Sequence, residues 1–226
     1  MHLVKTNILG NPNVGMYGYT TDEYCLIGQQ IPKRQSLSIE AALGVPVYQA
    51  RICGNELLGV FLAGVQKKLL VPGIAFDAEI GHLGKLGIDV VKVETDLTAL
   101  GNNMAISENG CVVNPEYGED TIALLKRELG ISVIRGTIGG YNIVGSLCKM
   151  NSKGALVSVE ANDAEAKLLA SQLGVPLSRG TVNQNSQYIS SGIICNSKGF
   201  VIGDLSTGPE IMDADTALGF LGADDE

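Results

Sequence analysis

The chain has 226 residues, with 16 Lys and Arg against 24 Asp and Glu, so its formal net charge is −8. Because 45% of the residues are hydrophobic and only 18% are charged, intrinsic disorder is excluded, and the length holds one large or two ordinary domains. The acidic balance argues against a broad basic surface that grips nucleic acid, and no apolar run approaches the ~18 residues of a membrane helix, so we expect a soluble, cytoplasmic protein without membrane contact.

The predicted elements recur along the chain with a fixed period. A Leu-Gly dipeptide occurs at residues 43, 86, 129, 173 and 218, and a stretch with helical periodicity precedes each copy. A β-branched-rich run follows the first four copies, which predicts a strand there. In NDAEAKLLASQLG, Asn162 or Asp163 can cap the helix and Gly174 can end it.

A β-hairpin is predicted before each of these helices. Asn151-Ser-Lys-Gly recurs as Asn196-Ser-Lys-Gly between two apolar runs, and such turn residues favour hairpins. A second marker is a glycine that we place in the first strand of each hairpin, at Gly15, Gly59, Gly101, Gly145 and Gly192. Both markers indicate the same repeat.

The repeat predicts the fold class: α/β, with five ββαβ repeats in a single domain that spans residues 1–226. The repeats run over about 9–52, 53–95, 96–138, 139–182 and 183–222, and the fifth lacks its last strand. Residues 2–8 can supply that strand and close a five-fold pseudosymmetric α/β propeller, with helices outside and glycine-bearing strands towards the axis. An open solenoid is the alternative, but it would leave an unpaired edge without polar capping, so we favour the closed ring.

The sequence offers no catalytic, metal or cofactor site. The five cysteines include no CxxC pair, which argues against structural zinc and a disulfide framework. The only two histidines, His2 and His82, have no acid or cysteine placed in sequence to orient them as a base. Residues beyond the repeated glycines differ between repeats, and a varied rim on a symmetric scaffold is suited to binding a protein.

Several motifs in repeat order carry a resemblance to a known family. They are TALGN at 98–102, GCVVNPE at 110–116, NIVGS at 142–146, LGVPLSRGTVN at 173–183, NSKGFVIG at 196–203 and TGPE at 207–210. Together they resemble the translation initiation factor 6 family, in its archaeal form, over essentially the whole chain. The resemblance implies the pentein fold and a factor that binds the large ribosomal subunit, prevents its association with the small subunit and takes part in large-subunit biogenesis. The implied partners are a basic ribosomal protein on the intersubunit face and rRNA near the sarcin–ricin loop.

The resemblance also implies a ribosome-binding surface on the ring face that carries the repeated glycines. The residues carried over by position are Gly15, Val60, Asn102, Leu147 and Gly192. Val60 departs from the eukaryotic branch, which has a basic residue there. We expect a monomer that is not an enzyme and has no cofactor and no small-molecule substrate. Two alternatives stay open: an enzyme acting on guanidino compounds through Cys195, and a scaffold for some other partner.

Overall fold

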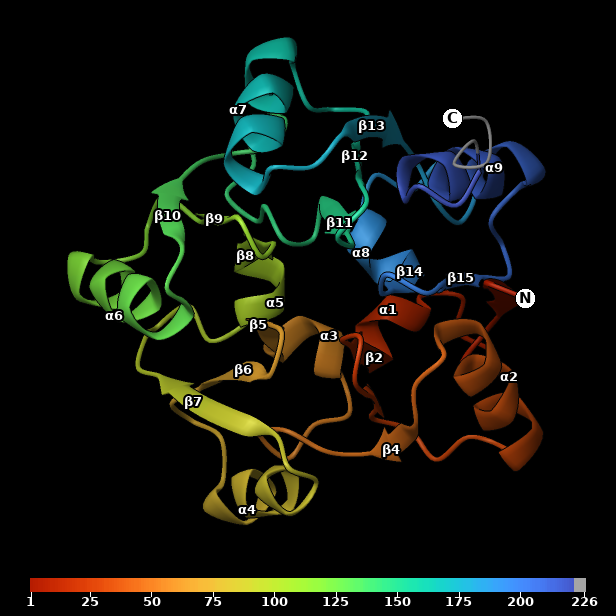
Figure 1. Cartoon of the computed structure of the whole chain (residues 1–226), viewed down its shortest axis with the longest axis horizontal. Helices are drawn as coiled ribbons and strands as arrows, with labels where there is room; N and C mark the ends of the chain where they lie inside the picture. The colour runs from red at the N-terminus through yellow and green to blue at the C-terminus, as the bar shows by residue number, and fades with distance from the viewer. Residues whose placement is uncertain (222–226) are drawn as a thin grey trace.

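Residues 1–221, which the computed structural model describes, form five small sheets around a central axis (Figure 1). In each sheet the inner and middle strands are antiparallel, and the outer strand is parallel to the middle one. The sheets of the first four repeats are β2 (Gly18–Thr20), β3 (Cys25–Ile27) and β4 (Val47–Gln49); β5 (Ala63–Val65), β6 (Lys68–Pro72) and β7 (Asp89–Val93); β8 (Met104–Ile106), β9 (Gly110–Val113) and β10 (Ser132–Arg135); β11 (Cys148–Met150), β12 (Ala155–Ser158) and β13 (Leu177–Gly180). The predicted end of the fifth repeat, residue 222, lies outside the described residues.

The first strand of the chain completes the fifth sheet. β1 (Leu3–Thr6) runs parallel to β15 (Phe200–Gly203), which pairs on its other side with β14 (Ile193–Cys195). The register joins Leu3 to Phe200 and Thr6 to Gly203. The predicted closure of the ring by the N-terminal strand is therefore confirmed, and the open solenoid is excluded.

Five helices cover the outside of the ring, as Figure 1 shows. They are α2 (Lys33–Leu43), α4 (Asp77–Lys85), α6 (Glu119–Leu129), α7 (Asp163–Leu173) and α9 (Gly208–Ala217). The predicted signals of the fourth helix are confirmed, because Asn162 Oδ1 accepts from the amides of Ala164 and Glu165, and Gly174 ends the helix in the left-handed region. The longest of these helices have 11 residues, and no helix among residues 1–221 is long and apolar enough to cross a membrane.

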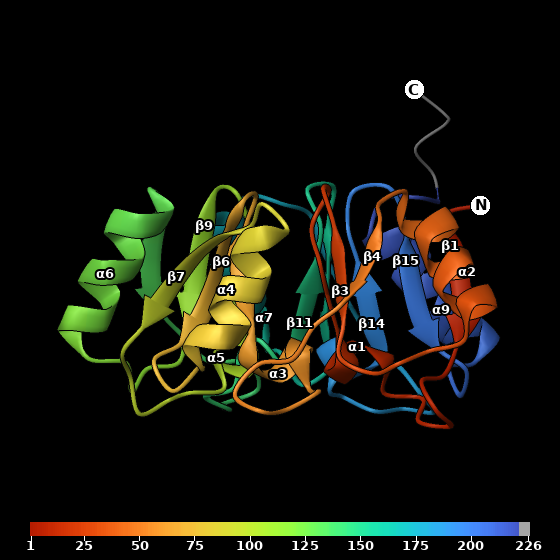
Figure 2. The ribbon, with the colours of Figure 1, turned by 90° about the horizontal axis from the view of Figure 1, so that it is seen from below.

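The sequence predicted that the repeated glycines lie in the inner strands, and this is wrong: they lie in short segments that precede these strands. Four one-turn helices precede inner strands: α1 (Val14–Tyr17), α3 (Leu58–Phe61), α5 (Leu100–Asn103) and α8 (Ile189–Gly192). Residues 144–147 form the equivalent turn in the fourth repeat. Gly15, Gly59 and Gly101 are each the second residue of such a turn, and Gly145 takes the same place. Figure 2 shows α1, α3 and α5 together at one end of the ring.

The core is divided into clusters that lie between neighbouring repeats. One cluster joins Leu26 of β3, Leu69 of β6 and Leu83 of α4, all fully or almost fully buried. Another joins Val112 of β9 to Val157 of β12. Each helix therefore buries its apolar side in the gap between two sheets, and each repeat depends on its neighbours for a closed core.

Candidate functional site

The candidate site is the end of the propeller that carries the one-turn segments, which we call the ring face. It comprises residues 14–17, 58–61, 100–103, 144–147 and 189–192, the loops between repeats, and the loops and first helical turns that follow the middle strands. The middle strands end there because each pairs antiparallel with the inner strand that follows a one-turn segment; the amide of Gly28 bonds to Tyr17 O at 2.8 Å, and that of Ser158 to Leu147 O at 2.8 Å. The opposite end carries the hairpin turns, and we call it the hairpin face.

Backbone crowding at the axis explains the repeated glycines. A Cβ added to Gly59 would lie 1.8 Å from Gly15 O, one on Gly101 would lie 2.1 Å from Gly59 O, and one on Gly145 would lie 2.1 Å from Gly101 O. A Cβ added to Gly15 would in turn lie 1.9 Å from Ser190 O. Only glycine lets the backbones of successive repeats approach so closely. The one-turn segments therefore contact one another in a ring.

The fifth member of this ring is Ser190, not Gly192. Ser190 is the second residue of α8, and its amide donates to Ser146 O at 3.1 Å, as the amide of Gly145 does to Asn102 O at 2.9 Å. Gly192 is buried, and a Cβ there would meet the Val182 side chain at 2.7 Å. The prediction of Gly192 as the fifth ring residue rests on the spacing of glycines. It is wrong because the fifth repeat has a serine at the ring position and a glycine two residues later.

A shallow depression of about 380 Å³ lies around the axis on the ring face. It is lined by the residues that follow the ring positions, and by three further residues from the loops before the one-turn segments. The first group is Met16, Val60, Asn102, Ser146 and Ser191; the second is Asn13, Ile143 and Tyr188. The structure thus brings Gly15, Val60 and Asn102 together, as the sequence predicted for the site.

Leu147 does not reach the depression. Its side chain is fully buried, in one core cluster with Ile138 and Val144. The turn at residues 144–147 directs Leu147 into the core, so that Ser146, the residue before it, lines the depression instead. For the ring face, we therefore replace Leu147 by Ser146 and Gly192 by Ser190, and the binding role of all these residues stays a prediction.

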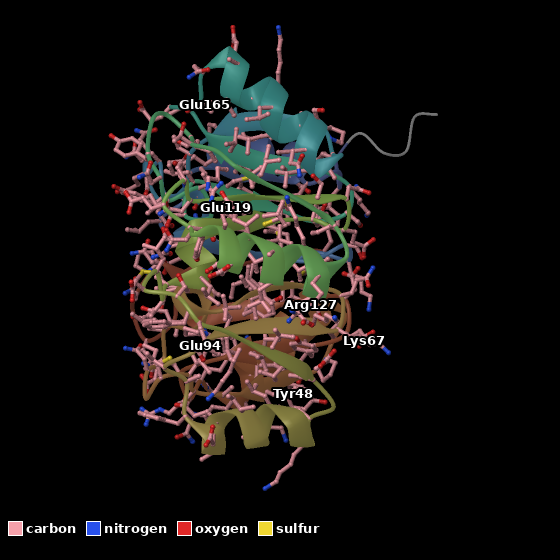
Figure 3. All side chains as sticks on the ribbon, turned by 90° about the vertical axis from the view of Figure 1, so that its left-hand side faces the viewer. Tyr48, Lys67, Glu94, Glu119, Arg127 and Glu165 are labelled. Carbon is pink, nitrogen blue, oxygen red and sulfur yellow. The ribbon has the colours of Figure 1, made fainter. Side chains whose placement is uncertain are left out.

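The ring face is strongly acidic. Its loops and first helical turns hold thirteen acidic residues: Glu56, Asp77, Glu79, Glu94, Asp96, Glu116, Glu119, Asp120, Glu160, Asp163, Glu165, Asp204 and Glu210. The same segments hold three basic residues, Lys33, Arg34 and Arg51. In Figure 3, Glu94, Glu119 and Glu165 lie towards one end of the short axis, and Lys67 and Arg127 towards the other.

Some of these carboxylates hold the fold rather than face a partner. Glu165 accepts from the amides of Gly139 and Gly140 at 2.8 and 3.1 Å, and from Thr137 Oγ1 at 2.8 Å. Burial opposes the charged form of Glu165, but these hydrogen bonds and one from the Asn162 amide outweigh it and lower its pKa. Glu165 therefore ties the loop before the fourth repeat to the start of α7.

Exposed apolar side chains gather on the same face. Seven of the large exposed hydrophobic residues lie in its loops: Leu9, Ile74, Phe76, Tyr141, Val159, Tyr188 and Leu205. Tyr188 is 44% exposed and stands at the edge of the depression. Apolar groups beside charged side chains are what a protein partner needs for burial and orientation.

The hairpin face has a second depression, of about 340 Å³, which Cys195 lines. The Cys195 thiol is almost fully buried and donates to Met150 O at 3.2 Å, and burial raises its pKa to about 11. Its hydrogen bonds among residues 1–221 include no histidine; His2 bonds to Asp215 at 2.9 Å and His82 to Gln49 O at 3.2 Å. A thiol that is protonated at neutral pH and has no base beside it is a poor nucleophile.

The described part of the chain also lacks a metal constellation. Within residues 1–221, no group of three or more His, Cys, Asp or Glu side chains is arranged to hold a metal ion. The ring face thus combines acidic loops, exposed apolar side chains and a depression at its centre.

Comparison with known proteins adds a family and a fold. The model of the eIF-6 family matches residues 3–217. The chain is 39% identical to translation initiation factor 6 of Pyrococcus furiosus over 227 residues, which cover 98% of this chain and all of that protein. It is 34% identical to the factor of Thermococcus onnurineus over 98% of this chain and all of that protein, and 36% identical to that of Saccharolobus solfataricus over 97% of this chain and all of that protein.

Two solved structures share the architecture at low sequence identity. A dimethylarginine dimethylaminohydrolase matches with a TM-score of 0.50 and 15% identity, over 74% of this chain and 67% of that chain. The N-terminal domain of ArgZ, an arginine dihydrolase, matches with a TM-score of 0.50 and 10% identity, over 84% and 72%. Both are pentein-fold enzymes, and at this identity they show that the five-fold ring is the pentein fold and nothing about activity.

Proposed function

This chain belongs to the eIF-6 family, and from that premise we propose that it binds the large ribosomal subunit and sterically prevents the small subunit from joining. The blocking action comes from the bulk of the ring, because a surface that is covered by one rigid body cannot receive a second. We propose the cytoplasm as the place of action, a monomer as the acting form, and a further role in large-subunit biogenesis.

The observation that carries this proposal is the composition of the ring face. Its loops and first helical turns hold thirteen acidic residues against three basic ones; three of the acids pair with bases on outer strands, and Tyr188 and other apolar side chains are exposed between them. Such a face complements a basic ribosomal protein, since opposite potentials speed encounter and apolar contacts then hold the complex. We assign the contact to the depression lined by Gly15, Val60 and Asn102.

The partner proposed for this face is a basic large-subunit protein on the intersubunit side, with rRNA near the sarcin–ricin loop beside it. Asn102 is the central candidate, because a side-chain amide can both donate to and accept from a partner backbone. Val60 offers an apolar contact in the same depression.

We propose that the factor does no covalent chemistry. The surroundings of Cys195 support this, because burial keeps the thiol protonated and its hydrogen bond goes to a main-chain carbonyl. An assay for release of ammonia or citrulline from arginine-like substrates tests the alternative. Turnover that Cys195→Ala abolishes would contradict the proposal.

Sucrose-gradient sedimentation tests the proposed function directly. Purified archaeal large and small subunits are mixed with and without the protein under conditions in which they associate. We expect the protein to sediment with the large subunit and to lower the fraction of joined ribosomes in proportion to its occupancy. If it stays at the top of the gradient, or sediments with joined ribosomes, the proposed function is wrong.

A further inference from the structure

One sector of the ring face reverses the charge pattern of the others. In the second, third and fourth repeats, the first residue of the long helix is acidic and pairs with a base on the outer strand of the same repeat. The pairs are Asp77 with Lys92 at 3.2 Å, Glu119 with Arg135 at 2.9 Å, and Asp163 with Arg179 at 2.7 Å. These pairs neutralise the outer edge of three repeats.

The first repeat has Lys33 at that helix position, followed by Arg34. Its outer strand has Gln49 where the second to fourth repeats have a base. Among the described residues, the ion pair of the other three repeats therefore has no counterpart between the start of α2 and β4. In the neighbouring fifth sheet, Lys5 pairs in register with Ile202 as Arg135 does with Val113. However, α9 begins with Gly208, so Lys5 meets no acidic residue at the helix start.

Lys33 and Arg34 lie beside the end of β1, whereas Lys5 points to the other side of that strand: Val4 packs on the α2 side with Ile39, and Leu3 on the α9 side with Ala214, so Lys5 shares the side of Leu3. Gln35, in the first turn of α2, donates through Nε2 to Thr6 Oγ1 at 3.0 Å, which holds the start of that helix against the end of β1. Figure 1 shows α2 beside the N-terminal strand. Of the two acids of the fifth repeat on this face, Glu210 is buried and Asp204 accepts from Asn7 Nδ2 at 2.6 Å. We call the pair formed by Lys33 and Arg34 the basic sector; both are exposed.

The position of these charges works against local stability. The positive end of a helix macrodipole favours acids in the first turn, and α4, α6, α7 and α9 each have at least one there, whereas α2 has none. Cations placed against this preference indicate a requirement other than folding. The first turn of α2 also has no side-chain cap; the amides of Gln35 and Ser36 donate to Pro32 O, which leaves those of Lys33 and Arg34 to meet an anion.

We infer that the basic sector contacts the phosphate backbone of RNA on the large subunit, an inference that rests on the proposed function. A chain with a net charge of −8 and an acidic ring face repels RNA over most of that face. Contact with phosphates is therefore confined to a sector where cations stand without acids, and Lys, Arg and helix amides are the groups that bind phosphates in protein–RNA interfaces. The sector would orient the factor, with the first repeat over RNA and the second to fourth repeats over basic protein.

A double variant tests this, Lys33→Gln with Arg34→Gln. Its matched control is Lys126→Gln with Arg127→Gln, the same residue pair in the last turn of α6, towards the hairpin face. Both variants have the same net charge, so long-range effects cancel. Affinity for purified archaeal large subunits is measured as salt is raised. We expect the first variant to bind about tenfold more weakly at ~0.1 M salt, with a salt slope shallower by about 1.5–2 because two phosphate contacts are lost, and the control to keep the wild-type affinity and slope.

Equal affinity and slope for the two double variants would overturn the inference, while binding of the wild type would leave the proposed function standing. If the wild type itself fails to bind, both are wrong. Lys33→Asp separates binding from folding, because it restores the acid of the other repeats. We expect an unchanged or higher melting temperature together with weaker binding; unchanged binding would count against the basic sector.

Cross-linking distinguishes RNA from an acidic protein as the occupant. Arg34→Cys carrying an aryl azide is bound to the large subunit and irradiated, with Arg127→Cys as the control for background labelling. Transfer of the label to rRNA above the control supports the inference. Transfer to ribosomal protein alone overturns it.

Discussion

The side-chain amide of Asn196 donates to the main-chain carbonyl of Leu43 at 2.9 Å, although 153 residues separate the two in the chain. Leu43 is the last residue of α2, so the hairpin of the fifth repeat satisfies a free carbonyl at the end of the first repeat's helix. Asn151 does the same for Leu218 at 3.0 Å, one repeat earlier. Asn196 thus closes the ring at the hairpin face, independently of β1.

We expect Asn196→Ala to lower the free energy of unfolding by about 2–3 kcal/mol, because the buried amide also donates to Thr21 O and its oxygen accepts from two amides of its own turn. Asn109→Ala is the control, since that exposed side chain makes longer bonds, 3.3 Å to Leu173 O, and should lose less than ~1 kcal/mol. Urea denaturation measures both. Equal losses in the free energy of unfolding would mean that the hydrogen bond to Leu43 does not stabilise the fold more than the bonds of Asn109 do.

Removal of residues 1–8 tests the strand that closes the fifth sheet. Without β1, the outer edge of β15 loses its partner and Phe200 loses cover, so we expect the loss of much of the ~5–15 kcal/mol of a typical native fold. We also propose that the full chain is a single domain that unfolds in one cooperative transition. An unchanged melting temperature after the deletion, or two separate transitions in the full chain, would contradict these expectations.

Gly59→Ala tests the crowding at the axis. The new Cβ would lie 1.8 Å from Gly15 O, so the ring must open, and we expect a loss of about 2–4 kcal/mol. Gly84→Ala is the matched control, because a Cβ at this helical glycine of α4 meets no atom within 4 Å. There we expect a gain of about 0.5–1 kcal/mol from the reduced entropy of the unfolded chain. Thermal or urea unfolding compares the two, and equal effects would refute the crowding.

The sequence predicted the architecture well because the signals of the architecture are local. The turn residues around Asn151 and Asn196 and the helix end at Gly174 can each be recognised without knowing what lies beside them. What these side chains do across the ring cannot be recognised in this way. The bond from Asn196 to Leu43 joins two ends of the chain, so only the closed fold brings them together.

The site was predicted less completely, for two reasons. The sequence pattern predicts strands around the repeated glycines, whereas these segments are one-turn helices or, at residues 144–147, a turn, and this places Ser146 rather than Leu147 on the surface. Spacing alone favoured Gly192, although Ser190 lies at the ring position. The acidic ring face did leave a signal that could have been used: acids gather in the loops that follow middle and outer strands, and those loops share one end of the ring.

The hydrogen bonds of Glu165 predict a loss of stability in acid. Its pKa is lower in the folded chain than the ordinary 4.5, so its contribution is present above that value and is lost as pH falls through the folded pKa. We expect the urea midpoint of the wild type to fall more between pH 7 and about pH 3.5 than that of Glu165→Gln, which has no charge to lose. Glu160→Gln, at an exposed residue of the preceding loop, is the control and should follow the wild type. Parallel curves for all three proteins would show that Glu165 is not coupled to folding.

Binding to the large subunit should depend on side chains at the central depression. Tyr188 is 44% exposed at its edge, and a half-buried aromatic side chain on a flat rigid face is the kind of residue that dominates a protein interface. We expect Tyr188→Ala and Asn102→Ala each to weaken binding about tenfold in sedimentation or biolayer measurements, with little change in melting temperature. Met212→Ala is the matched control, because Met212 is 58% exposed in α9, outside the depression, and should bind as the wild type does. If Met212→Ala weakens binding and Tyr188→Ala does not, the partner covers the outer helices instead of the ring face, and the proposed orientation is wrong.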